Sequence, residues 1–172
     1  MRFADLLRAT VLLSAAAATL LVVITVLSVS RDYDGVVVVV SLAWWTAATA
    51  IGMVMGRGSE ANPAIARLLA LARHQGTLPE LRPGRTMLNR LWPLLVVSLG
   101  GGVVGIFLPQ VASVAAGFCI IWALAWRGQH LAVQAIEERD GARFYVDRTS
   151  PFAPMRLVRT PGFGGSFVRR PV

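Results

Sequence analysis

The sequence predicts an all-α integral membrane protein with four transmembrane helices and a short C-terminal segment patterned like a β-hairpin. Composition is the first observation behind this prediction: of the 172 residues, 55% are hydrophobic and only 15% are charged. Globular domains carry about 25% charged residues. The second observation is that long stretches contain no charge at all, and a transmembrane helix needs about 20 apolar residues in succession.

Three uncharged stretches supply the four predicted spans. Residues 9–30 and 35–56 each have the length of one membrane helix. Residues 91–126 are too many for a single helix and contain Pro109 near their centre, so they predict two short helices. Runs of this length exclude the short alternating strands of a membrane β-barrel. The expected spans are therefore about 9–30, 35–56, 91–108 and 110–127, with residues 57–90 as the link between the second and the third.

The distribution of arginine predicts the orientation of these spans. All 17 basic residues are arginine, and Arg31 alone falls on the side opposite to the other sixteen. By the positive-inside rule, both termini should face the cytoplasm. Trp92, Trp122 and Trp126 fall at the same predicted interface, as an aromatic belt would. The absence of lysine indicates a GC-rich genome, which favours a bacterial cytoplasmic (plasma) membrane.

A second interpretation exists for the first span. Arg2 and Arg8, followed by an apolar run that ends at residues 28–30 with Ser-Val-Ser, also fit a cleaved secretory signal. The apolar run has about 20 residues, whereas the apolar core of a signal peptide has about 7–15. The length favours a retained membrane helix.

The link between the second and third spans contains a predicted amphipathic helix. Asn62 and Pro63 form a helix start signal, with a capping residue followed by proline at the first helical position. We expect about 12 helical residues, ending at Gly76, with the apolar face in the lipid headgroup layer. Its arginines suit anionic headgroups, at about 1 kcal/mol each, or an acidic protein partner. The apolar residues at helical spacing are Ile65, Leu68, Leu69 and Ala72.

The C-terminal segment changes pattern after the last span. The fourth helix is expected to continue past the membrane as far as Gly141, because glycine commonly ends helices. Residues 143–147 and 155–159 then read as two short strands of a hairpin. A lone hairpin is marginally stable in water, so we expect it to pack on the surface helix, a second copy or another protein's sheet edge. The predicted domains are 1–128, the transmembrane part, and 129–172, the cytoplasmic extension and tail.

Small residues predict how the last two spans pack. Gly101 and Gly105 form a GxxxG pattern, which allows two helix backbones to approach closely. A kink at this glycine cluster is the alternative, and a dinucleotide-binding loop is disfavoured because no strand precedes it. Trp44 and Trp45 fall near mid-span and should contact neighbouring helices or lipid tails, with a ligand platform as the alternative. The small residues expected to face the glycines on the fourth helix are Ala112, Ala116 and Gly117.

The chemistry available to the chain is limited. The interiors of the predicted spans contain no Asp, Glu, His, Lys or Arg, although proton-coupled transport usually relies on such groups. Cys119 is the single cysteine, which excludes a disulfide framework and a thiolate metal cluster. His130 has no carboxylate or second histidine four residues on, so it forms no helical ligand pair with its neighbours. The sequence therefore predicts no catalytic residue, cofactor site or metal site. It also predicts no nucleic-acid binding, because the arginines flank apolar runs.

These observations favour a non-catalytic accessory, scaffold or assembly subunit that binds a protein partner, or a second copy, through its cytoplasmic face. One alternative is an oligomeric channel or carrier for an uncharged or lipid-like solute. Another is a membrane enzyme acting on a lipid-linked substrate. The residues expected to contact a partner or the anionic headgroups of the bilayer are Arg67, Arg73, Arg82, Arg85, Phe144, Val146, Arg156 and Arg159.

Overall fold

The computed structural model of the chain describes residues 1–32, 35–58, 61–74, 83–147 and 155–161. Within them, the side chains of Arg31, Asp32, His74, Pro83 and Arg85 are not described. Gly76 and Arg82, to which the sequence assigned roles, lie outside the described residues. The elements are α1 (Phe3–Asp32), α2 (Gly35–Met55), α3 (Pro63–Ala70), β1 (Arg73–His74), α4 (Pro83–Phe107), α5 (Pro109–Trp126), α6 (Gln129–Asp140), β2 (Ala142–Val146) and β3 (Leu157–Pro161).

Four helical segments in the described part of the chain are long and apolar enough to cross a membrane. They cover Phe3–Ser30, Gly35–Met55, Thr86–Phe107 and Pro109–Asp140. The predicted number of spans is confirmed in this sense. The first and third helices begin earlier than predicted, because each one continues beyond its uncharged stretch toward the end that carries the strands.

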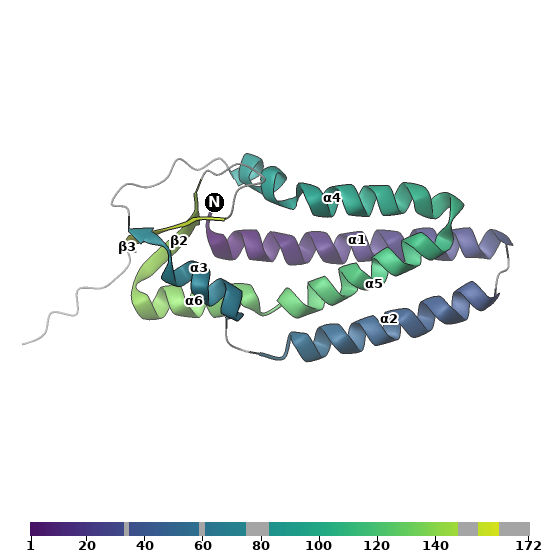
Figure 1. The fold of residues 1–172 in the computed structure, drawn as a ribbon, viewed down its shortest axis with the longest axis horizontal. Helices are drawn as coiled ribbons and strands as arrows, with labels where there is room; N and C mark the ends of the chain where they lie inside the picture. The colour runs from purple at the N-terminus through teal and green to yellow at the C-terminus, as the bar shows by residue number, and fades with distance from the viewer. Residues whose placement is uncertain (33–34, 59–60, 75–82, 148–154, 162–172) are drawn as a thin grey trace, which may run out of the picture.

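The helix α5 is central to the membrane part. It packs against α1, α2 and α4, and α1 also packs against α4. The consecutive helices α1 and α2 make little contact with each other, so α2 is attached mainly through α5. Figure 1 shows α1, α2, α4 and α5 extending lengthwise, with α3, α6, the strands and the N-terminus together at one end. We call this end the cap; it consists of α3, α6, the three strands, the first turn of α1, and Met155 and Arg156, which directly precede β3.

The cap contains a three-stranded sheet with the order β1-β3-β2. The strands β2 and β3 are antiparallel, with Tyr145 opposite Val158, and this pairing confirms the predicted hairpin. The chain itself supplies support on both sides of the pair. The strand β1 lies parallel to β3, and the N-terminus pairs with β2, where Val146 N–H donates to the carbonyl oxygen of Met1 at 3.1 Å.

The helix α3 differs from its prediction in length and in what its apolar face contacts. Its start is confirmed, because the Asn62 side chain accepts a hydrogen bond from Ala64 N–H at 3.1 Å and Pro63 is the first helical residue. It has only 8 residues, because residues 73 and 74 leave the helical path to pair with β3. Ile65 is 1% exposed within the protein core. The predicted contact of this face with lipid is therefore wrong for Ile65.

One buried cluster crosses the predicted boundary at residue 128. Phe144 of β2 and Leu157 of β3 share it with Phe3 of α1 and Val133 of α6. The preceding helix α6 ends at Gly141, whose φ of 58° is left-handed, as the sequence predicted. The side chain of Glu137 closes this corner by accepting a hydrogen bond from Phe144 N–H at 2.8 Å. The tail is thus packed on the start of α1.

Candidate functional site

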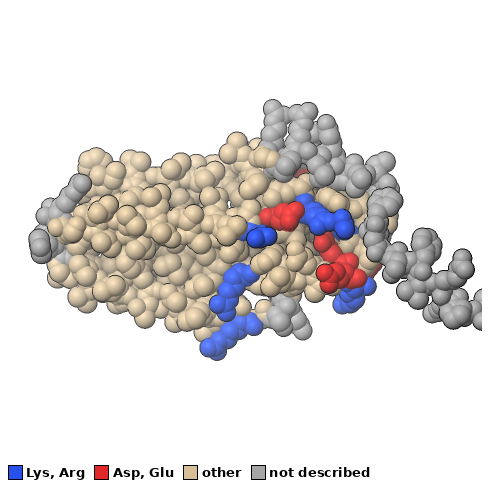
Figure 2. All heavy atoms as spheres, turned by 180° about the vertical axis from the view of Figure 1, so that it is seen from behind, with Lys and Arg blue, Asp and Glu red and all other residues tan. Residues whose placement is uncertain are grey.

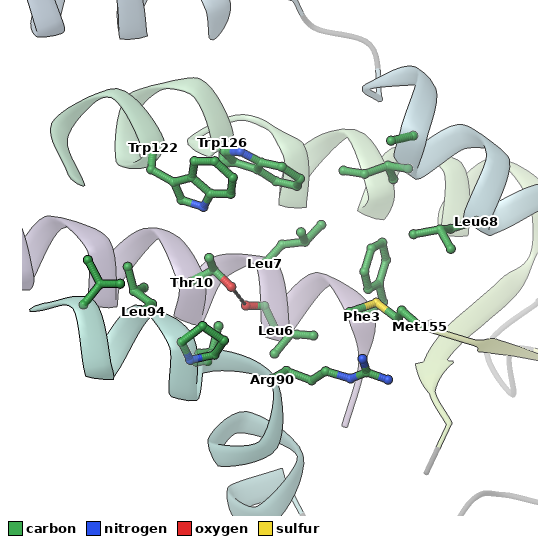
Figure 3. Close-up of a pocket in the computed structure, with 15 residues that line it drawn as sticks. Phe3, Leu6, Leu7, Thr10, Leu68, Arg90, Leu94, Trp122, Trp126 and Met155 are labelled. Atoms are coloured by element: carbon green, nitrogen blue, oxygen red, sulfur yellow. Dashed lines mark hydrogen bonds between the residues drawn. The ribbon is translucent and has the colours of Figure 1, made fainter. Parts of the chain in front are cut away.

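One cavity lies where the long helices meet the cap. It has a volume of about 550 Å³ and is bounded by α1, α3, α4 and α5. Figure 3 shows Trp122 and Trp126 of α5 on one side, Arg90 and Leu94 of α4 on the other, and side chains of α1 between them. The principal lining residues are Phe3, Leu6, Leu7, Thr10, Ile65, Leu68, Arg90, Leu94, Val97, Trp122, Trp126 and Met155.

The walls of this cavity are almost entirely apolar. The hydroxyl of Thr10 donates to the carbonyl oxygen of Leu6 at 2.8 Å, so its hydrogen-bonding capacity is directed at its own helix. Among the described lining residues, Arg90 is the single charged one. The two indoles of Trp122 and Trp126 are stacked, with ring centroids 5.7 Å apart. The cavity therefore offers a long apolar surface and one cationic group.

A second cavity adjoins the first along α4 and α5. Its volume is about 560 Å³, and it shares Leu94, Val97 and Trp122 with the first. We call the two cavities together the α4–α5 groove. Its lining on α5 begins at the polar Gln110 and continues with apolar residues from Val111 to Trp126, a rise of about 22 Å for the apolar part at about 1.5 Å per residue. The groove is thus longer than half of a hydrocarbon core, which is about 30 Å thick.

The groove arises from the way α4 and α5 diverge. Figure 1 shows α5 running obliquely away from α4 after the turn that joins them. At this joined end the contact is tight, because a Cβ on Gly105 would overlap the Cβ of Ala112, and one on Gly101 would lie 3.3 Å from the Cβ of Ala115. Toward the cap, the bulky Trp122 and Trp126 replace these small residues. The two helices are therefore in close contact where the turn joins them, and a space opens between them near the cap.

The small residues predicted to join the last two spans contact three different helices. Gly105 and Ala112 do meet across α4 and α5. Ala116 instead belongs to a buried cluster with Ala17, Ala18 and Leu21 of α1. The position of Gly117 is covered by the indole of Trp44 on α2, and a Cβ there would overlap the ring. The small residues of α5 thus allow α1, α2 and α4 to approach it closely.

Four of the six arginines predicted to contact a partner or headgroups have described side chains, and these four lie on the cap. Arg67, Arg73 and Arg156 are exposed. Arg159 is half-buried, with its guanidinium 3.7 Å from the carboxylate of Asp140. Figure 2 shows that the charged side chains of the rear face gather over the half of the molecule that carries the cap.

Two of the residues predicted to contact a partner are interior. Phe144 is 2% exposed and Val146 is also buried. Their alternation with polar residues reflected packing on α1, because the first residues of the chain cover this face of the hairpin. Neither side chain is available to a partner in this structure.

The most informative residue of the groove was not predicted as a site residue. Arg90 counted only as one of several arginines in the link, because its position depends on how α4 lies against α1. Two of the three acidic side chains of α6 have structural partners: Glu137 accepts from Phe144 N–H, and Asp140 lies 3.0 Å from Arg139. No group of three or more His, Cys, Asp and Glu side chains converges within the described ranges.

Comparisons with known proteins add no relative. The chain matches no family model, no curated protein and no solved structure. Its function is therefore inferred from the geometry of the groove and the cap.

Proposed function

We propose that this chain is a non-catalytic, multi-pass protein of the bacterial cytoplasmic membrane that binds the apolar chain of a lipid laterally in the α4–α5 groove. The adjoining cavities carry this proposal, because they form an open surface that is apolar over about 22 Å of α5. Each cavity falls in the range of about 300–1,000 Å³ that is typical of ligand sites. In a bilayer, acyl chains are the apolar molecules present at this depth.

The proposed orientation places the cap and both termini in the cytoplasm. The exposed arginines Arg67, Arg73 and Arg156 are all on the cap. Cytoplasmic loops carry an excess of arginine and lysine near the ends of spans. In this orientation, the end of the groove near Trp122 and Trp126 lies at the cytoplasmic interface, where tryptophan and tyrosine are enriched.

A non-catalytic role is favoured over a lipid-modifying enzyme because of how the acidic groups are used. General acid–base catalysis requires a side chain within hydrogen-bond reach of the reacting group. The Glu137 carboxylate instead holds the backbone of Phe144, and Asp140 pairs with Arg139. Neither carboxylate lines the groove.

Photo-crosslinking in nanodiscs tests the proposed function. A phospholipid with a photoreactive group on its acyl chain should label the groove at Leu94, Val97 and Trp122, and unlabelled lipid should compete. The exposed face of α2, which includes Val39 and Val40, provides an internal control for ordinary contact with the bilayer. Equal, non-saturable labelling of α2 and the groove would show that lipid touches the groove without being bound there.

A role as an accessory or scaffold subunit for a partner protein is a second candidate. The exposed arginines of the cap favour it, because they offer a basic surface to an acidic protein as well as to headgroups. Affinity purification in mild detergent tests this role. It compares the wild type with a double variant that carries Arg67→Gln and Arg156→Gln. A partner that is recovered with the wild type and lost with the variant would support it, whereas a partner-free wild type would exclude it.

A further inference from the structure

We infer, on the basis of the proposed function, that the α4–α5 groove selects a phosphate-bearing lipid and that the guanidinium of Arg90 binds the phosphate. Among the described residues that line the cavity beside the cap, Arg90 is the one cationic group, and the others are apolar apart from the internally bonded hydroxyl of Thr10. A ligand that complements this arrangement has a single anionic end and a long apolar remainder. A glycerophospholipid has this form.

The position of Arg90 places the charge at one end of the groove. Figure 3 shows its side chain extending from α4 along the first turns of α1, with the guanidinium directed toward Phe3 and Met155 of the cap. Val97, on the same helix, lines both cavities and lies about 10 Å deeper at about 1.5 Å per residue. A phosphate at Arg90 would therefore allow the acyl chain to run past Val97 into the second cavity.

The level of Arg90 also matches that of a headgroup. It is one turn inside the start of the span at Thr86, and Trp122 and Trp126 stand across the same cavity. Such aromatic residues are enriched at the membrane–water interface. Basic pockets between membrane helices on the cytoplasmic side are sites for anionic lipid headgroups. The charge of Arg90 and its depth in the span thus both fit the anionic headgroup of a phospholipid.

An arginine is well suited to this role. Its guanidinium carries five N–H donors in a planar fork that matches the oxygens of a phosphate. Arg90 also interacts within the chain, and the number of donors allows it to hold such a contact and a phosphate together. The apolar surroundings strengthen a charge-assisted hydrogen bond because the local dielectric constant is low.

Competition against the photoreactive phospholipid tests the headgroup preference on the full chain. Phosphatidylglycerol and phosphatidic acid should displace the probe from wild-type protein about tenfold better than diacylglycerol with the same acyl chains. Diacylglycerol has no phosphate and so cannot form the hydrogen bond between charged groups. Arg90→Gln should remove this preference, and Arg90→Lys should keep most of it. Arg127→Gln is the matched control, since Arg127 is exposed at the end of α5 and lines neither cavity.

The outcomes separate this inference from the proposed function. Equal displacement by phosphatidylglycerol and diacylglycerol in the wild type would overturn the role of Arg90 while leaving the groove a lipid site. Failure of every lipid to displace the probe would overturn the proposed function itself. Displacement by glycerol 3-phosphate, which has no acyl chain, would reveal a site for free phosphate and contradict the inference. Binding of diacylglycerol to Arg90→Gln protein shows that the variant still folds.

Discussion

The hydroxyl of Ser113 on α5 donates a hydrogen bond to the hydroxyl of Ser41 on α2, with 2.7 Å between the two oxygens. Next to it, the indole N–H of Trp45 donates to the carbonyl oxygen of Ser113 at 3.0 Å. Because α2 makes little contact with α1, these bonds act at the main attachment of α2 to the other helices. The indole N–H of Trp44 adds a third bond from α2 to α5 by donating to the carbonyl oxygen of Val114 at 3.3 Å.

Removing these hydrogen bonds should loosen α2. Each of Ser41→Ala and Trp45→Phe is expected to lower the free energy of unfolding by about 0.6 kcal/mol, and by no more than about 1.7 kcal/mol, as for other hydrogen bonds between membrane helices. Unfolding in mixed micelles with increasing dodecyl sulfate measures this change. Thr46→Val is the control, because the hydroxyl of Thr46 bonds to Leu42 within α2. A loss of stability for the control equal to that for Ser41→Ala would contradict the assigned role.

The glycines of α4 should respond differently to the same substitution. Gly105→Ala should destabilise the protein, because the new Cβ would overlap the Cβ of Ala112. Gly100→Ala places its Cβ in open space and should be neutral or stabilising, by up to about 1 kcal/mol, because alanine favours the helix. Thermal unfolding in detergent compares the two variants. Similar melting temperatures for both would show that close packing at Gly105 is unimportant.

The cap should depend on its buried phenylalanine. Phe144→Ala is expected to destabilise the cap by about 3–5 kcal/mol, the usual effect of truncating a buried aromatic residue. Hydrogen exchange should then report faster exchange in β2, β3 and the first turn of α1, while the deeper part of α5 stays protected. Phe107→Ala provides the comparison, because Phe107 is 79% exposed. If the faster hydrogen exchange were confined to β2 and β3, the tail would be independent of α1.

The proposed orientation can be tested by cysteine labelling. In a Cys119→Ala background, Gln134→Cys on the cap and Gly35→Cys at the opposite end of α2 are both at exposed positions. A membrane-impermeant maleimide added to intact cells should label only Gly35→Cys, and Gln134→Cys should react after the membrane is opened. The reverse pattern would place the cap outside the cytoplasm.

The features that could be predicted from the sequence are those that local physics determines. The length of the uncharged stretches predicted four helices of membrane-spanning length. Capping chemistry predicted where α3 begins, at Asn62 and Pro63, and where α6 ends, at Gly141. Alternation of apolar and polar residues predicted a hairpin at 143–147 and 155–159, and the structure pairs residues 142–146 with 157–161.

The features that could not be predicted depend on contacts between distant parts of the chain. The shortening of α3 follows from the pairing of Arg73 with Val158, and nothing near residue 73 indicates that partner. Phe144 was predicted to contact a partner or headgroups, because the strand pattern does not show that the N-terminus covers it. The α4–α5 groove is likewise a result of the angle between two helices. Its lining residues have no spacing that distinguishes them from ordinary apolar helix positions.

Two neighbouring valines give the most direct test of lipid binding in the groove. Val97 is 58% exposed and lines both cavities, whereas Val96 is 57% exposed and lines neither. Native mass spectrometry of protein released from nanodiscs should show a retained lipid on the wild type and on Val96→Trp. It should show little or none on Val97→Trp, whose indole would fill the junction of the two cavities. Equal lipid retention by both tryptophan variants would contradict binding in the α4–α5 groove.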